Sequence, residues 1–287
     1  MNVKEIIRSI RRIELKTRSF SNQNFSGMDK SSSKGLGMNF SEVREYHFGD
    51  ETRFIDWNVT ARYNDPHVKV FEEDREHLNV FFIDVSGSLD FGAKNRSKKR
   101  VLIEMFATIA FSCVLNQDKI GVVLFSDEVV KYYEPKKGHK YVWQILKFLI
   151  ENDFSSSSSD PTVAFTFFQK TKWQKYRVFL LSDLIFSNTN QVISAFKKVK
   201  KKNRAYVLKV YDNLELNIPA PGFYQLVNSE SGLMSWVNGF SSKAQNEFER
   251  VHNEVDQIWT LECKKSKILH CSLSTEDDIF SVLNGFF

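Results

Sequence analysis

Cysteine is scarce in this chain, which has three among its 287 residues: Cys113, Cys263 and Cys271. Three is an odd number, and the spacing matches no zinc-finger pattern, which argues against a cysteine-based metal site. Each cysteine lies among apolar or strand-like residues, and no secretory signal is recognisable. We therefore predict reduced thiols in the core and no disulfide between Cys263 and Cys271.

Long apolar runs are also missing. No uninterrupted stretch approaches the roughly 20 apolar residues that span a bilayer, and residues 1–18 lack the apolar centre of a signal peptide. We expect a cytoplasmic protein with no membrane span. Residues 3–17 carry apolar side chains at an approximately helical spacing among basic ones. Such a helix suits a membrane surface or nucleic acid, but more often it packs on its own domain, which we favour.

Several catalytic and nucleic-acid-binding signatures are absent. The chain contains no Gly-x-Ser-x-Gly elbow, and no histidine stands in a supporting motif for a nucleophilic serine. The formal net charge of +5 neither requires nor excludes a nucleic-acid partner. The lysine-rich end of the helix predicted near residues 190–202 lacks interleaved aromatics for base stacking, so we interpret it as a solvated face.

Apolar strands alternate with longer apolar-periodic helices through most of the chain. Strands are predicted at residues 78–83, 120–126, 176–181, 205–210 and 268–273, and helices at 98–115, 141–151, 190–202, 244–264 and 277–284. This alternation predicts an α/β fold with a doubly wound, mainly parallel sheet flanked by helices. We place the main domain at residues 78–287, with residues 1–77 forming an N-terminal helix and a collar segment that packs on it.

Polar residues directly follow the first of these strands. Asp84, Ser86 and Ser88 alternate along the chain, which keeps their oxygen-bearing side chains on one side, and Gly87 lets the loop curl around a small ion. Carboxylate and hydroxyl oxygens suit a hard cation. We predict Mg²⁺, although the same ligands serve Mn²⁺ or Ca²⁺. Without further ligands the segment would be only a polar loop.

A second carboxylate stands at the end of another strand. The apolar run at residues 176–181 ends in Ser182 and Asp183. Ligands of parallel sheets collect at the carboxyl ends of the strands, where Asp84 also lies. A lone aspartate there would be interpreted as a turn or a helix cap. Together with the first loop, Asp183 favours a metal site.

The Asp-x-Ser-x-Ser pattern at residues 84–88 resembles the metal-ion-dependent adhesion site of von Willebrand factor A domains. The resemblance implies that Ser86 and Ser88 contact the metal, and that Asp84 and the distant Asp183 reach it through water. It also implies a threonine ligand from a middle loop. The sixth position is left open for a carboxylate of a binding partner.

Two residues compete for the middle-loop position. Residues 159–165, Ser-Asp-Pro-Thr-Val-Ala-Phe, resemble the family's Thr-Asp-Leu-x-x-Ala-Leu, which places Ser159 where the family has its metal-binding threonine. Serine keeps the hydroxyl but lacks the methyl group that restricts the rotamers of threonine. Thr162 is the rival candidate, and we prefer Ser159. Pro161 suits the first turn of a helix that follows.

The segment from Gly35 to Asp74 packs glycine, aromatic and charged residues closely together. This segment contains a block that is similar to the signature of family 58 of domains of unknown function. The block reads Gly37-x-x-Phe40-x-Glu42-Val43-Arg44-Glu45-Tyr46, then Gly49-Asp50, Arg53, Ile55-Asp56-Trp57 and Ala61-Arg62. The match runs on through Gly92. The resemblance implies a von Willebrand A-like fold, a frequent association with MoxR-type AAA+ ATPases and no established enzymatic activity.

We interpret the charged residues of this collar segment as internally paired rather than as a ligand site. Trp57 is a large potential anchor, and we expect it to be buried. We also expect Asp56 to pair with Arg62.

For the whole chain we predict a non-enzymatic, metal-dependent protein-binding module that works with a MoxR-type AAA+ ATPase on a client. A metal-dependent hydrolase or phosphatase is the first alternative. Phosphoryl transfer of the haloacid-dehalogenase type resembles Asp-x-Asp, however, and Ser86 holds its second position here. A nucleic-acid-binding protein that uses the basic helices is the second alternative.

Overall fold

The computed structural model describes residues 3–20, 38–63, 65–73, 77–92, 96–154, 158–171, 173, 175–201, 203–216, 222–227, 234–238 and 242–286. The chain divides into two compact units. One is formed by residues 27–76, and we call it the collar unit. The other, the main unit, is formed by residues 1–26 together with residues 77–287.

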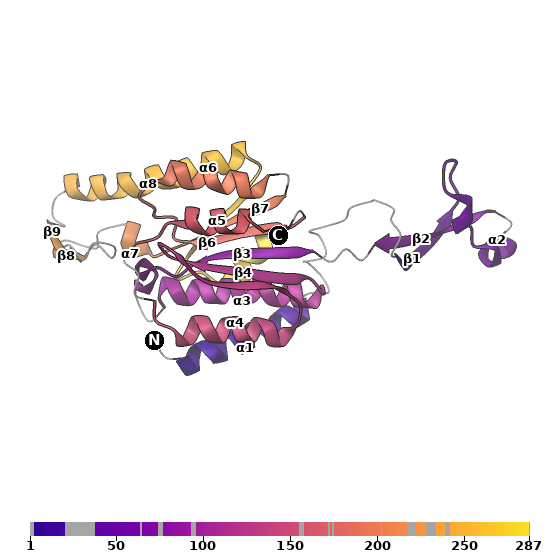
Figure 1. The fold of residues 1–287 in the computed structure, drawn as a ribbon, viewed down its shortest axis with the longest axis horizontal. Helices are drawn as coiled ribbons and strands as arrows, with labels where there is room; N and C mark the ends of the chain where they lie inside the picture. The colour runs from indigo at the N-terminus through magenta and orange to yellow at the C-terminus, as the bar shows by residue number, and fades with distance from the viewer. Residues whose placement is uncertain are drawn as a thin grey trace. The chain divides into compact units, whose positions relative to one another are not determined.

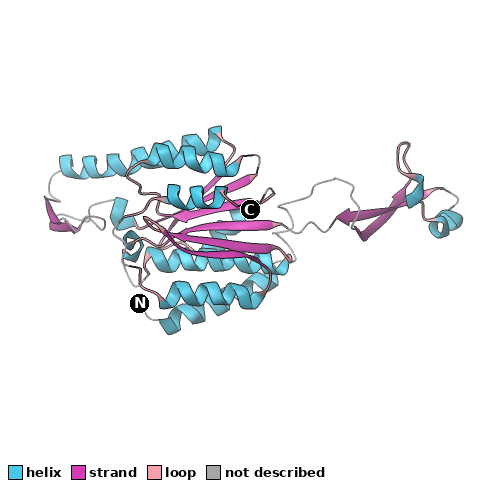
Figure 2. Ribbon diagram, viewed as in Figure 1, coloured by secondary structure: helices cyan, strands magenta, loops and turns pink. Residues whose placement is uncertain are grey.

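A six-stranded sheet forms the centre of the main unit, with the strand order β10-β7-β6-β3-β4-β5 (Figure 1, Figure 2). Its strands are β3 (Leu78–Asp84), β4 (Lys119–Phe125), β5 (Val129–Lys136), β6 (Arg177–Ser182), β7 (Arg204–Tyr211) and β10 (Leu269–Ser274). All neighbours pair in parallel except the edge strand β5, which pairs antiparallel with β4. The predicted α/β fold with a mainly parallel sheet is confirmed.

Helices cover both faces of this sheet (Figure 1). One face carries α1 (Val3–Phe20), α3 (Lys98–Leu115), α4 (His139–Glu151) and α9 (Ile279–Phe286). The other face carries α5 (Pro161–Gln169), α6 (Thr189–Lys200) and α8 (Ser242–Lys265). The short helix α7 (Asn213–Leu216) and the antiparallel hairpin of β8 (Phe223–Val227) and β9 (Met234–Asn238) connect β7 to α8. Within the described residues, no helix has the length and apolar character needed to cross a membrane.

Two neighbouring phenylalanines of β3 point to opposite faces of the sheet, and both are fully buried. Phe81 stacks on Phe179 of β6 with the ring centroids 4.7 Å apart, and Phe179 stacks in turn on Tyr206 at 4.6 Å. On the other face, Phe82 meets the ring of Phe165 in α5 edge-on at 5.0 Å. Burial on both faces explains the continuous apolar run of β3. It also fixes the register that brings Asp84 to the end of this strand.

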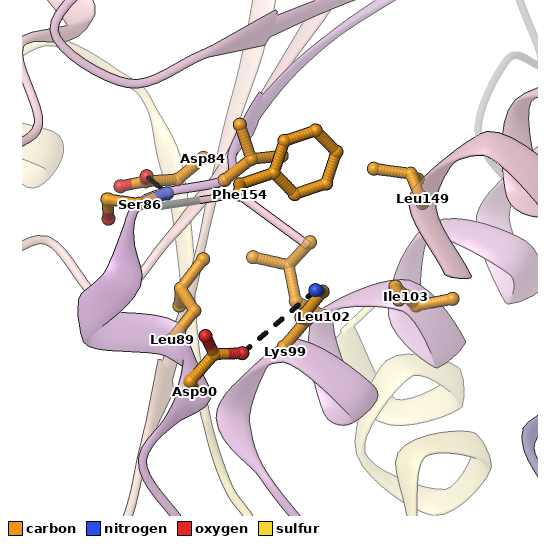
Figure 3. Close-up of a pocket in the computed structure, with 10 residues that line it drawn as sticks. Asp84, Ser86, Leu89, Asp90, Lys99, Leu102, Ile103, Leu149 and Phe154 are labelled. Atoms are coloured by element: carbon orange, nitrogen blue, oxygen red, sulfur yellow. Dashed lines mark hydrogen bonds and ion pairs between the residues drawn. The ribbon is translucent and has the colours of Figure 1, made fainter. Parts of the chain in front are cut away.

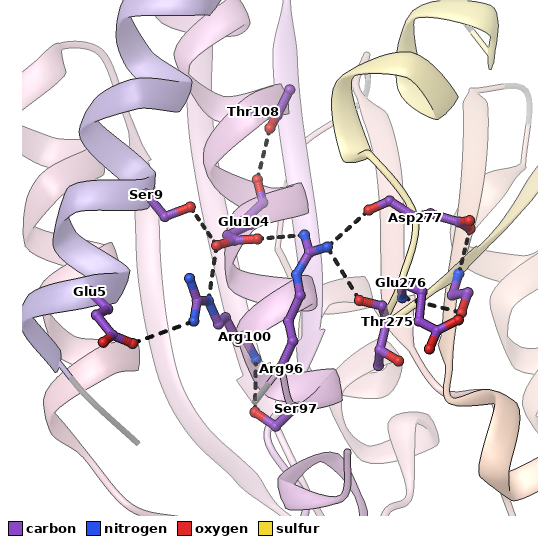
Figure 4. A network of polar contacts seen from close by, with 11 residues as sticks. Glu5, Ser9, Arg96, Ser97, Arg100, Glu104, Thr108, Thr275, Glu276 and Asp277 are labelled. Carbon is purple, nitrogen blue, oxygen red and sulfur yellow. Dashed lines mark hydrogen bonds and ion pairs between the residues drawn. The ribbon is translucent and has the colours of Figure 1, made fainter. Parts of the chain in front are cut away.

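Helix α1 packs on α3 through an apolar stripe and a buried carboxylate. Ile6, Ile10 and Ile13 are buried at helical spacing. The Glu104 side chain of α3, 4% exposed, accepts hydrogen bonds from the Ser9 hydroxyl at 2.6 Å and from the Arg96 guanidinium at 2.6 Å (Figure 4). The guanidinium also donates to two backbone carbonyls after β10. The basic N-terminal helix therefore packs on its own domain, as predicted.

The three cysteines are free thiols, as predicted. Cys113 and Cys263 are buried, and Cys271 is half-buried. Burial raises the pKa of Cys263 and of Cys271 to about 11, so both thiols stay protonated and unreactive at neutral pH.

The collar unit is built on an antiparallel pair of strands, β1 (Met38–Glu45) and β2 (His67–Glu73). Gly49 has a φ of +103° in the turn after β1, a conformation that suits glycine. Across this turn the Arg44 guanidinium donates two hydrogen bonds of 2.8 Å to the Asp50 carboxylate. This bidentate pair is one of the internal ion pairs expected in the collar, and Arg53 forms another with Glu51 at 2.5 Å.

Two predictions for the collar unit are wrong. Between its strands lie the 3-10 helix η2 (Thr52–Phe54) and α2 (Trp57–Tyr63). Helix α2 has only seven residues and buries none of them, which leaves Trp57 70% exposed. Asp56 caps α2 by accepting the N–H groups of Asn58 and Val59, and its ion-pair partner is Lys69 at 3.4 Å instead of Arg62. The predicted packing of the collar on the main domain stays a prediction.

Candidate metal centre

The loop after β3 gathers the first three predicted ligands. Asp84, the last residue of the strand, is 1% exposed. One of its carboxylate oxygens accepts the Ser86 N–H at 2.9 Å, and the hydroxyl oxygens of Ser86 and Ser88 lie 3.1 Å apart. Gly87 begins a short 3-10 helix, η3 (Gly87–Asp90). The structure therefore brings Asp84, Ser86 and Ser88 together.

The underside of this loop is apolar. Leu89 is 1% exposed, and it lines a cavity of about 10 Å³ together with Leu102 and Ile103 of α3 and Leu149 of α4 (Figure 3). Such a cavity is about the size of one water molecule. Because Leu89 is buried and η3 contacts α3, the loop that carries the two serines is held on the main unit.

The middle loop contributes Ser159. Its hydroxyl donates to the second carboxylate oxygen of Asp84 at 2.9 Å. The rival candidate, Thr162, lies in the exposed first turn of α5, and its hydroxyl donates to Asp160 at 2.6 Å. Asp160 caps this helix and Pro161 opens it, as expected. The structure brings Ser159, and not Thr162, to the strand ends.

Strand β6 supplies two more side chains from its carboxyl end. The predicted Asp183 has a side chain only 2% exposed, and one of its oxygens accepts the Ile185 N–H at 3.3 Å. The preceding Ser182 donates its hydroxyl to Asp84 at 2.8 Å. Ser182 is not among the ligands predicted from the sequence, although its place beside Asp183 at the strand end is a signal that could have identified it. We call Asp84, Ser86, Ser88, Ser159, Ser182 and Asp183 the oxygen cluster.

Two charged residues that the sequence does not single out lie beside this cluster: Lys98 contacts Asp183, and Glu215 contacts Lys98. The Lys98 ammonium, whose side chain is 0% exposed, donates to Asp183 at 2.8 Å and lies 2.6 Å from the Glu215 carboxylate of α7. Lys98 stands in a run of basic residues that is typical of a solvent-exposed segment, and Glu215 lies 117 positions further along the chain. No sequence signal distinguishes this pair from ordinary surface charges.

Burial and like charge raise the pKa of Asp84 to about 6, burial being the larger cause and the Asp183 carboxylate the second. Burial also raises the pKa of Glu215. Burial would lower the pKa of Lys98, but the carboxylates of Asp183 and Glu215 outweigh it and raise that pKa. The three carboxylates and the one ammonium together carry a formal charge of −2 when all are ionised.

Exposed carboxylates lie on the segments that follow β3, β4 and α4. Asp90 in η3, Asp127 after β4 and Asp160 before α5 are all exposed. The Lys99 ammonium lies 4.0 Å from Asp90 and 3.6 Å from the exposed Asp153, and its side chain is only 10% exposed. These acidic residues, Asp90, Asp127, Asp153 and Asp160, form what we call the rim. The rim disfavours approach of an anion to the bare cluster.

The oxygen cluster fits a hard divalent cation. It offers carboxylate and hydroxyl oxygens, the donors that Mg²⁺ prefers, and a formal charge of −2 that a divalent cation would neutralise. In the described part of the chain, no group of three or more histidine, cysteine, aspartate or glutamate side chains is arranged to hold a metal. Serine hydroxyls would therefore have to complete the ligand set.

A family model described as "Protein of unknown function DUF58" matches residues 42–257, which run from β1 into α8. This chain belongs to the DUF58 family. The resemblance to this family that the collar block carries is confirmed.

Curated relatives of this DUF58 chain include uncharacterized proteins from Mycobacterium bovis and Mycobacterium tuberculosis. Each is 24% identical over 202 residues, which cover 70% of this chain and 63% of the relative. The chain thus matches less than two thirds of the length of these relatives.

Three solved structures are similar to this chain at low identity. A conserved hypothetical protein, BatB from Bacteroides thetaiotaomicron, is 14% identical with a TM-score of 0.40, over 67% of this DUF58 chain and 98% of that one. A von Willebrand factor type A protein from Catenulispora acidiphila is 10% identical with a TM-score of 0.37, over 77% of this chain and 42% of that one. An aerotolerance-related membrane protein from Bacteroides fragilis is 14% identical with a TM-score of 0.45, over 73% of this chain and 96% of that one.

Proposed function

We propose that this DUF58 chain is a metal-dependent protein-binding module, with Mg²⁺ held by the oxygen cluster. The observation that carries the proposal is the convergence of two buried carboxylates and four hydroxyls at the carboxyl ends of β3 and β6, with excess negative charge. When bound, the cation would supply an open coordination position for a carboxylate of a partner. Mn²⁺ or Ca²⁺ could use the same oxygens.

The roles of the chain's own residues follow from their hydrogen bonds. Asp84 accepts the hydroxyl protons of Ser159 and Ser182, which turns the oxygen lone pairs of these groups away from the carboxylate. The Ser86 N–H fixes the other oxygen of Asp84. By the family resemblance, Ser86, Ser88 and Ser159 would hold the cation directly, and Asp84 and Asp183 through water.

The acidic rim makes the proposed binding dependent on the cation. A partner's aspartate or glutamate would be repelled by the rim and by Asp84 and Asp183 when no metal is bound. A bound divalent cation would neutralise the formal charge of −2 at the site. The family resemblance suggests that the partner is a MoxR-type AAA+ ATPase or a client that such an ATPase remodels.

Hydrolysis and nucleic-acid binding are less well supported at this site. The residue two positions after Asp84 is Ser86, where phosphoryl transfer of the haloacid-dehalogenase type would need an acid, and no histidine of the chain lies in the loops that form the cluster. The Lys98 ammonium is occupied by two carboxylates. Phosphate backbones would meet the same acidic rim. We therefore propose binding without turnover.

Affinity capture of the tagged protein from its native lysate tests this proposal. A partner should be recovered with Mg²⁺ and lost with chelator, and it should also be lost with Ser86→Ala combined with Ser88→Ala. Ser281→Ala, which changes an exposed serine in α9, is the matched control and should capture as the wild type does. Equal recovery of the same partners with Mg²⁺ and with chelator would contradict the proposal.

A further inference from the structure

Lys98 occupies a position where a cation is locally unfavourable. It is the first residue of α3, and the N-terminus of a helix disfavours positive charge. Its ammonium is also fully removed from solvent, which is costly for an ion. The carboxylates of Asp183 at 2.8 Å and Glu215 at 2.6 Å offset both effects. One of these two carboxylates belongs to the oxygen cluster, so the charge of Lys98 acts directly on the proposed metal site.

Lys98 changes the charge of the site in both of its states. With Lys98, the ionised side chains of Asp84, Asp183 and Glu215 leave a formal charge of −2, and a bound divalent cation brings the site to zero. Without Lys98 the same site would carry −3 when empty and −1 when loaded. A loaded site of −1 repels a carboxylate, whereas a neutral one does not.

We propose that Lys98 sets the balance between metal affinity and partner affinity: it weakens the hold of the cluster on the divalent cation and strengthens the hold of the loaded cluster on a carboxylate. This inference rests on the proposed metal-dependent function. Because metal and carboxylate bind to the same site, each tightens the other by the same factor. Without Lys98 the site would bind the metal tightly whether or not a partner is present. With Lys98 the metal is bound more weakly, and tight metal binding requires the partner's carboxylate.

A purely structural role for Lys98 predicts a different change in the metal affinity and the carboxylate affinity. If the ammonium only held Asp183 and the short helix α7 in place, its removal would disorder the cluster, and both affinities would fall together. The two roles therefore differ in the sign of the change. A charge-setting role moves the two affinities in opposite directions.

Four versions of the full chain test the inference at pH 7.5: wild type, Lys98→Met, Glu215→Gln and the double variant. Summed over Asp84, Asp183, residue 215 and residue 98, their formal charges are −2, −3, −1 and −2. Methionine keeps the length of the lysine stem, and glutamine keeps the shape of glutamate. Mn²⁺ affinity is measured from the free-ion signal in electron paramagnetic resonance. Acetate is then titrated onto the Mn²⁺-loaded protein and followed by water-proton relaxation, since acetate displaces metal-bound water.

Lys98→Met should bind Mn²⁺ about tenfold more tightly and acetate about tenfold more weakly than the wild type. Glu215→Gln should shift both affinities in the opposite directions, and the double variant should return to within about threefold of wild type. Circular dichroism checks the fold of each protein. If Lys98→Met does not fold, the double variant is compared with Glu215→Gln, and it should bind Mn²⁺ more tightly and acetate more weakly.

A fall of both affinities together on loss of Lys98, in a folded protein, would overturn the inference and leave the proposed function standing. The inference is likewise overturned if the wild type binds Mn²⁺ but the Mn²⁺ and acetate affinities of the variants do not follow the formal charges given above. Failure of the wild type to bind Mn²⁺ at all would overturn the proposed function and the inference with it.

Discussion

Replacement of Asp84 by asparagine should abolish Mg²⁺ binding and, at the same time, stabilise the metal-free protein at pH 7.5. Asp84 is 1% exposed, and burial together with the charge of Asp183 raises its pKa to about 6. At pH 7.5 the carboxylate is ionised in an environment that favours its neutral form. Asparagine removes this charge, on which metal binding depends.

The hydrogen bonds of Asp84 can survive this substitution. The amide oxygen of asparagine can accept the Ser86 N–H, and the amide nitrogen can donate to the hydroxyl oxygens of Ser159 and Ser182, which are free to rotate. The main change is therefore loss of a buried negative charge beside Asp183. Loss of a disfavoured charge at a functional site commonly stabilises a protein while it impairs function.

The stabilisation should depend on pH with a definite sign. The folded pKa of about 6 lies above the ordinary value of 3.8, so the folded protein binds more protons than the unfolded chain between these values. Wild-type stability contributed by Asp84 is thus present below pH 3.8 and is lost as the pH rises through 6. The loss amounts to about 3 kcal/mol, since one pKa unit corresponds to about 1.4 kcal/mol.

Urea unfolding of wild type and Asp84→Asn in chelator, at pH 4.5 and at pH 7.5, measures this difference. Comparison at each pH cancels the titration of other carboxylates that the two proteins share. The stability gain of the variant should be larger at pH 7.5 than at pH 4.5. A variant that is destabilised equally at both values, or that still binds Mg²⁺ as the wild type does, would contradict the assignment of Asp84.

Replacement of Asp183 by asparagine should weaken Mg²⁺ affinity by about 10-fold to 100-fold, the usual effect of losing a group that acts on a metal through an outer shell. The amide keeps the size of the carboxylate but gives up its charge. The Lys98 ammonium keeps Glu215 as a partner at 2.6 Å, so the fold should persist. Partner binding should fall with metal affinity, and excess Mg²⁺ should restore part of it by mass action.

The same variant separates binding from catalysis. We expect the purified wild type to hydrolyse neither ATP nor a simple phosphoester with Mg²⁺ present. An enzyme would turn over one of these, and Asp183→Asn would lower the rate even at saturating metal. Metal-dependent hydrolysis that is lost in both Asp84→Asn and Asp183→Asn would replace the binding module with a hydrolase.

The fold could be predicted from the sequence because its signals are local. Strand β3 is buried on both faces and therefore has a continuous apolar run, and α3 begins and ends where its apolar period predicts, at Lys98 and Leu115. Parallel topology then places Asp84 and Asp183 at the same edge of the sheet. The proximity of Ser86, Ser88 and Asp183 to Asp84 could thus be anticipated without coordinates.

The remaining features depend on distant packing. Lys98 and Glu215 look like surface charges until the fold buries one against the other. The sequence resemblance already favours Ser159 over Thr162, but the hydrogen bond from Ser159 to Asp84, 75 residues away, is seen only in the fold. Trp57 is predicted to be buried because large aromatic side chains usually are buried. The seven-residue helix that carries it, however, buries no side chain within the collar unit.

Calorimetric titration of Mg²⁺ into the full chain, with and without Ser86→Ala combined with Ser88→Ala, tests the metal site most directly. The hydroxyl oxygens of these serines lie 3.1 Å apart on a loop that the buried Leu89 anchors, so their loss should leave the fold intact. We predict one Mg²⁺ per wild-type chain and no measurable binding by the double variant, with matching circular dichroism spectra. Equal Mg²⁺ binding by both proteins, or none by the wild type, would contradict the account.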